Sequence, residues 1–221
     1  MKLKIIKEVF VGCMIHVTLY CIAVFINKFL AHKGMNVITA IDYYIPTLTF
    51  PFFMFYISYY VLLFLGPCFV GHKNEKTLNR YTTNLIISTT VGFLIFIFFP
   101  TYVDRSCFPI DQNCIFYKPL LLLYKADFNG LALPSFHCLI SWLVFIAIRQ
   151  LRNIYITTKL LFFILCFGIC LSTFFIRQHG FIDFPAAVLL AEITNACVTK
   201  WKLDILLFNY IENYRKGYNK N

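Results

Sequence analysis

Residues 155–176 read YITTKLLFFILCFGICLSTFFI and contain one charged side chain, Lys159. A helix needs about 20 mostly apolar residues to cross a membrane, because about 30 Å of hydrocarbon is spanned at about 1.5 Å per residue. Within lipid the backbone must also satisfy its own hydrogen bonds, which a helix does. The stretch therefore predicts a membrane-spanning helix.

Other stretches of the chain share this apolar character, so we expect six spanning helices in all. The expected spans are Val9–Ala31, Thr47–Val70, Asn84–Thr101, Pro134–Ile148, Tyr155–Ile176 and Asp183–Thr199. No repeat or linker divides the chain, which favours a single domain over residues 1–221. The predicted fold class is all-α: a polytopic membrane protein with six transmembrane helices in one bundle.

The composition excludes a soluble or disordered protein. Hydrophobic residues make up 60% of the 221 residues and charged residues 14%, with a mean hydropathy of +0.72. A soluble domain carries roughly 25% charged residues. The chain is too apolar for water to be its main solvent, and membrane lipids are its expected surroundings.

The net charge of +10 has a topological explanation. When Lys and Arg are counted by alternate segments, 14 fall on the side of the two termini and 6 on the other side. The positive-inside rule then makes both termini cytoplasmic, with residues 200–221 as a tail at the inner interface. We therefore expect no nucleic-acid partner, but a multi-pass protein of the bacterial inner membrane whose site faces the periplasm or exterior.

Ionisable groups at membrane depth cost about 2.5–3.5 kcal/mol each at a helix centre, so those present call for an explanation. A few polar residues gather at the expected outer ends of the helices, although they are far apart in the sequence. These are Arg105 after the third span, Ser135 and His137 at the start of the fourth, and Ser172, Arg177, His179 and Asp183 around the turn between the fifth and sixth. A helical bundle can bring such residues together.

These residue types suit phosphoryl chemistry. His179 and Asp183 are four residues apart, so the carboxylate can hold one imidazole nitrogen while the other acts as a base or nucleophile. His137 adds a second imidazole for general acid catalysis, and Arg105 and Arg177 can bind an anion. A metal site is less favoured, because a third or fourth strong ligand is missing.

The motifs resemble those of the type 2 phosphatidic acid phosphatase superfamily, over roughly residues 98–187. The Pro-Ser-x-His motif is complete at residues 134–137, and Ser172, His179 and Asp183 keep the spacing of the family's third motif. Thr173 replaces that motif's arginine, while Arg177-Gln178-His179 is similar to a variant with a basic residue two before the histidine. Of the first motif only Arg105 remains.

The resemblance implies a membrane lipid phosphatase that hydrolyses a phosphomonoester or diphosphate of a lipid without metal or cofactor. In that reading His179 becomes a phosphohistidine, Asp183 orients it and His137 protonates the leaving group. Arg105, Ser135, Ser172 and Arg177 would bind the phosphoryl oxygens.

Several alternatives stay open from the sequence. The motif variants also resemble the branch with inositol phosphorylceramide synthases, which implies a lipid phosphotransferase, and a non-catalytic transporter or binding protein is a third hypothesis. Cys107 and Cys114 lie in an expected outer loop, where a disulfide is permitted. His16 has no motif near it and is expected to be a satisfied polar residue, and Glu192 is expected to bond within the bundle.

Overall fold

The computed structural model describes residues 2–30, 34–108, 110, 112–126 and 130–218, and its regular structure is almost entirely helical. In chain order the elements are α1 (Lys2–Leu30), β1 (Met35–Asn36), α2 (Ala40–Tyr44), α3 (Phe52–Lys73), α4 (Glu75–Phe98), β2 (Thr101–Tyr102), a 3-10 turn (Arg105–Cys107), α5 (Tyr117–Ala126), α6 (Phe136–Gln150), α7 (Ile156–Phe175), α8 (Asp183–Trp201) and α9 (Leu203–Tyr218). The predicted all-α class is confirmed.

Within the described residues, four helices are long and apolar enough to cross a membrane: α3, α4, α7 and residues Ile5–Phe29 of α1. They correspond to the first, second, third and fifth expected spans. The fourth coincides with α6, which has 15 residues, and the sixth with α8, which carries Asp183, Glu192 and Lys200. Six spans therefore stay a prediction.

An expected helix boundary differs from the observed one where a capping residue, and not the hydropathy of the sequence, determines where the helix begins. α4 begins at Glu75 and not at Asn84, because the Asn74 side chain accepts a hydrogen bond from Thr77 N at 3.1 Å and so caps the helix. Ala31, the expected end of the first span, and residues 219–221 of the expected tail lie outside the described residues.

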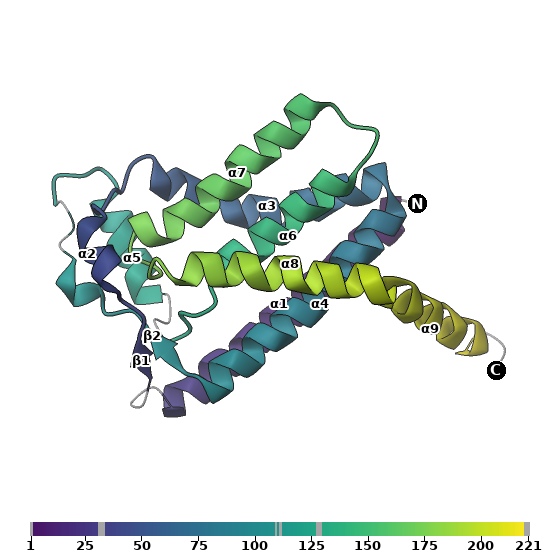
Figure 1. Ribbon diagram of the computed structural model, residues 1–221, viewed down its shortest axis with the longest axis horizontal. Coiled ribbons are helices and arrows are strands. Elements are labelled where there is room, and N and C mark those ends of the chain that lie inside the picture. Colours follow the sequence, from purple (N-terminus) through teal and green to yellow (C-terminus); the bar gives the residue numbers. More distant parts are fainter. Residues whose placement is uncertain (1, 31–33, 109, 111, 127–129, 219–221) are drawn as a thin grey trace.

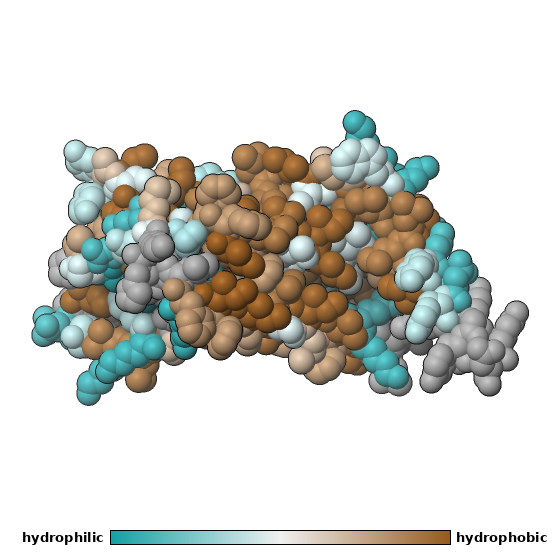
Figure 2. All heavy atoms as spheres, turned by 90° about the horizontal axis from the view of Figure 1, so that it is seen from below, coloured by the Kyte–Doolittle hydropathy of each residue, from teal (hydrophilic) through white to brown (hydrophobic). Residues whose placement is uncertain are grey.

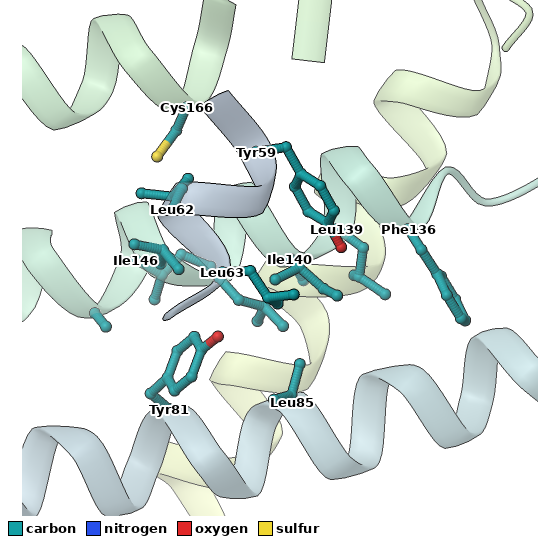
Figure 3. Packing of buried hydrophobic residues seen from close by; sticks show 14 of the residues in the cluster. Tyr59, Leu62, Leu63, Tyr81, Leu85, Phe136, Leu139, Ile140, Ile146 and Cys166 are labelled. Carbon is teal, nitrogen blue, oxygen red and sulfur yellow. The ribbon is translucent and has the colours of Figure 1, made fainter. Parts of the chain in front are cut away.

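α6 lies at the centre of the bundle and packs against α3, α4, α7 and α8. Figure 3 shows Leu139, Ile140 and Ile146 of α6 among side chains from α3, α4 and α7. A helix surrounded by others can be buried over most of its surface, and ten of the 15 residues of α6 are buried. Its first turn, with Phe136 and His137, is thereby fixed in the interior.

The outer surface of the bundle is apolar as well. Figure 2 shows hydrophobic residues spread over the middle of the molecule and hydrophilic residues concentrated toward its two ends. On α1, Ile5, Val9 and Cys13 are buried whereas Phe10 and Phe25 are more than half exposed. Large exposed apolar side chains of this extent suit a lipid environment.

The short elements gather at one end of the molecule. In Figure 1 the β1 and β2 pair, α2 and α5 lie at the end opposite to the N and C termini. β1 and β2 run parallel, with Met35 opposite Thr101, and Thr101 also forms a bridge with Leu131. This arrangement places residues 131–133 beside the strand pair and close to the start of α6.

Candidate active site

The turn between α7 and α8 is held by contacts from several segments. The backbone N–H groups of Gln178 and His179 both donate to Thr173 O, at 2.8 and 3.0 Å. The N–H of Phe181 donates to Oδ1 of the buried Asp42 in α2, at 2.8 Å. Arg177 adopts a φ of 59°, which turns the chain out of α7. These contacts fix the backbone that carries His179.

His179 has the orientation that its spacing from Asp183 predicts. Its Nδ1 lies 3.0 Å from Ala132 O and 3.3 Å from Asp183 Oδ2, which also accepts the N–H of Gly180 at 2.9 Å. Both partners of Nδ1 are acceptors, so we assign the ring proton to Nδ1. Nε2 is then the nitrogen that carries the lone pair.

His137 faces His179 from the first turn of α6. The two ring centroids are 6.0 Å apart, with the rings inclined at 62°. Tyr56 and Tyr59 of α3 pack against the His137 ring at centroid distances of 4.7 and 4.4 Å, which holds the imidazole in place. Ser135 precedes it as the N-cap of α6, with its Oγ accepting from Cys138 N at 3.4 Å.

Both histidines line one pocket of about 330 Å³. Its other walls are mostly aromatic and aliphatic: Val17, Tyr20, Tyr59, Tyr60, Leu63, Phe64, Phe96, Leu131, Ala132 and Phe136, together with His16 and Gln178. Val17 on α1 and Tyr60 and Phe64 on α3 are 45%, 48% and 47% exposed. The pocket thus reaches the apolar outer surface between α1 and α3.

Arg177 does not point toward the two histidines. Its buried guanidinium donates to Asp42 O at 3.1 Å, to Thr47 Oγ1 at 3.1 Å and to Ile45 O, and it lies over the Phe108 ring at 3.9 Å. The side chain joins the turn to α2 and to the segment that follows it. The position of Arg177 two residues before His179 suggested that it binds an anion. Its contacts instead indicate that it holds the turn in place.

The other predicted anion-binding residues are also set back from the pocket lining. Arg105 donates to Gln178 Oε1 at 2.7 Å and to Arg177 O at 3.2 Å, and its guanidinium lies over the Tyr124 ring. Burial raises the pKa of Tyr124 to about 12, so its hydroxyl stays protonated and donates to Ile176 O at 2.5 Å. Ser172 is buried and donates to Ile169 O, one turn back in α7.

Two pocket residues were not predicted as site residues. Gln178 lies between Arg177 and His179, which were both predicted as site residues. Its position directly before His179 could have indicated that it belongs to the site. His16 of α1 is 6% exposed, and its Nδ1 has no hydrogen-bond partner in the described part of the chain, so the protein itself does not satisfy this nitrogen as expected. Nothing in the sequence connects His16 with motifs more than a hundred residues later.

The remaining expectations concern Glu192, the two loop cysteines and metal binding. Glu192 accepts hydrogen bonds from Trp142 Nε1 at 2.9 Å and from Arg149 at 2.9 and 3.1 Å, which confirms that it bonds within the bundle. Cys107 and Cys114 are both free thiols. Over the residues that are described, no three His, Cys, Asp or Glu side chains are grouped so that they could hold a metal ion.

Comparison with protein family models, with curated proteins and with solved structures gave no match to this chain.

Proposed function

We propose that the chain is a membrane enzyme that removes phosphate from a lipid phosphate or diphosphate, with His179 as the nucleophile. The observation that carries the proposal is the hydrogen bonding of His179 Nδ1 to Asp183 and Ala132, with His137 in the same pocket. A protonated Nδ1 leaves Nε2 as the attacking atom, and a nearby carboxylate stabilises the positive charge that develops on the ring.

The proposed reaction has two steps. In the first, Nε2 of His179 forms a bond to phosphorus, the bond from phosphorus to the lipid oxygen breaks, and His137 gives that oxygen a proton. In the second, His137 takes a proton from water, the water oxygen bonds to phosphorus, and the bond from phosphorus to nitrogen breaks. Phosphate leaves, and both histidines return to their starting states.

The shape of the pocket supports a lipid substrate. Its walls are mostly apolar, and it reaches the outer surface between α1 and α3 at Val17, Tyr60 and Phe64. A lipid could enter from the bilayer with its phosphate toward the histidines and its tail toward that opening. Phe136 and His137 belong to the first turn of α6, and the N-terminus of a helix favours an anion.

We also propose that α6 and α8 cross the membrane with the other four helices, and that both termini are cytoplasmic. The position of the termini at one end of the molecule, opposite to β1, β2 and α5, supports this orientation (Figure 1). The site would then work on the extracytoplasmic side. A charge excess on the terminal side agrees with the same orientation.

The test is phosphate release by the purified protein from phosphatidic acid, phosphatidylglycerol phosphate and polyprenyl diphosphate, with EDTA present. We expect release by the unchanged protein and its loss in His179→Ala. His72→Ala, at the exposed end of α3, is the matched control and should keep full activity. Release that persists in His179→Ala would overturn the mechanism.

The phosphotransferase alternative uses the same residues and is separated from hydrolysis by its product. Lipid alcohols, such as ceramide and diacylglycerol, are added to the same reaction. A new phospholipid formed at the expense of free phosphate would reassign the chain as a transferase. Free phosphate alone would support hydrolysis.

A further inference from the structure

Gln178 is a buried residue in the wall of the pocket. The residue is 2% exposed, lines the pocket with both histidines and directly precedes His179. Its Oε1 accepts a hydrogen bond from Arg105 Nη2 at 2.7 Å, and its Nε2 has no hydrogen-bond partner among the described residues. Because an arginine N–H can only donate, the atom that faces it must be the oxygen, and the NH₂ group must be the other end.

Arg105 is itself held in place. Its Nε donates to Arg177 O at 3.2 Å and its Nη1 to Tyr124 O at 3.4 Å, while its guanidinium lies 4.7 Å from the Tyr124 ring centroid. The guanidinium therefore orients the Gln178 amide. A positive charge on the oxygen end of an amide also strengthens its N–H groups as donors.

A buried NH₂ group without a partner is unfavourable, and its presence in a native pocket calls for a ligand that accepts its hydrogen bonds. Phosphoryl oxygens are strong acceptors of this kind. We propose that Gln178 Nε2 donates to a phosphoryl oxygen of the substrate, and that Arg105 acts on the substrate through Gln178 as a positioning residue. This inference rests on the function proposed above.

The first experiment measures binding without turnover. Dodecyl phosphonate, whose carbon–phosphorus bond resists hydrolysis, is titrated into the purified full-length protein and its affinity is read from a thermal shift. Gln178→Glu keeps the acceptor for Arg105 but replaces the donor with a negatively charged oxygen. We expect it to weaken phosphonate binding and to lower kcat/KM by about 10- to 100-fold.

The matched control is Gln150→Glu at the end of α6. Gln150 Nε2 donates to Asn195 Oδ1 at 2.9 Å, outside the pocket, so this variant makes the same chemical change without facing the histidines. We expect phosphonate affinity and kcat/KM within about twofold of the unchanged protein. An equal loss in both variants would overturn the assignment, because the effect would then come from the fold.

The second experiment tests whether Arg105 acts through Gln178. Gln178→Leu, Arg105→Met and the double variant are compared for phosphonate affinity, with the thermal unfolding of each variant as a check on folding. If Arg105 works through Gln178, the double variant binds as weakly as Gln178→Leu alone. If the double variant instead loses phosphonate affinity by the product of the two single losses, Arg105 contacts the anion directly and its positioning role is overturned.

The two proposals fail in different ways. If the unchanged protein binds phosphonate and releases phosphate while Gln178→Glu does both equally well, the role of Gln178 is wrong and the proposed function stands. If the unchanged protein neither binds phosphonate nor releases phosphate from any lipid, both proposals are overturned.

Discussion

Replacing Arg177 by methionine separates a structural role from an anion-binding role. The unchanged side chain is 2% exposed and donates to Asp42 O, Thr47 Oγ1 and Ile45 O. Methionine has a similar length but no donors. We expect the variant to be less stable, because it loses the contacts that hold the turn to α2 and to the segment after it.

The expected loss in the free energy of unfolding depends on which of the three acceptors stay buried in the variant. Hydrogen bonds to a charged group contribute about 1.5–3 kcal/mol each. Asp42 is fully buried, so its contact counts in full, whereas Ile45 and Thr47 are half-buried and regain part of their hydrogen bonding from water. Stacking over Phe108 adds about 0.5–2 kcal/mol. We expect Arg177→Met to lower the free energy of unfolding by about 2–5 kcal/mol.

The assay is reversible unfolding in detergent, followed by tryptophan fluorescence, alongside phosphate release at a temperature where the variant is folded. Arg152→Met is the control, because Arg152 is exposed in the loop between α6 and α7 and its loss should change stability by about 0.5 kcal/mol or less. Unchanged stability together with abolished phosphate binding in Arg177→Met would refute the structural role and restore the anion-binding role suggested by the sequence.

Two further predictions test the packing of the turn and the orientation of the chain. A Cβ on Gly180 would lie 3.0 Å from Val37 O, and Val37 is itself bonded to Tyr102, so Gly180→Ala should cost about 1–3 kcal/mol in an unfolding assay. Gly12→Ala in α1, where the added atom meets Leu85 at an ordinary 3.5 Å, is the control and should be neutral or stabilising; equal losses would contradict the account. Cys107 is an exposed free thiol near the proposed outer face, so a membrane-impermeant maleimide should label it in intact cells, without prior reduction. Labelling that requires permeabilised cells would reverse the proposed orientation.

The apolar helices were the most predictable part of the fold, because hydrocarbon imposes length and composition on a spanning segment. The run 155–176 became α7 with one residue lost at each end. The start of α4 was missed because Asn74 supplies a cap that a hydropathy pattern does not register. α6 is shorter than a usual span, and its central place in the bundle depends on contacts with four other helices.

The site was predictable where its residues are close in the sequence. His179 and Asp183 are four apart, and their expected contact is present at 3.3 Å. Arg177 was assigned to the anion from its position near His179, yet its partners Asp42, Ile45 and Thr47 are 130 or more residues away in the chain. Spacing along the chain cannot indicate which way such a side chain turns, and for the same reason His16 was missed.

Trapping of a phosphoenzyme tests directly whether His179 is the nucleophile. The purified protein is mixed with a lipid phosphate labelled with radioactive phosphorus, quenched under alkaline conditions that preserve phosphohistidine, and digested for peptide mapping. We expect label on the peptide that contains His179, its loss in His179→Ala and its retention in His72→Ala. Rapid phosphate release with no labelled His179, or equal labelling in His179→Ala, would contradict this expectation.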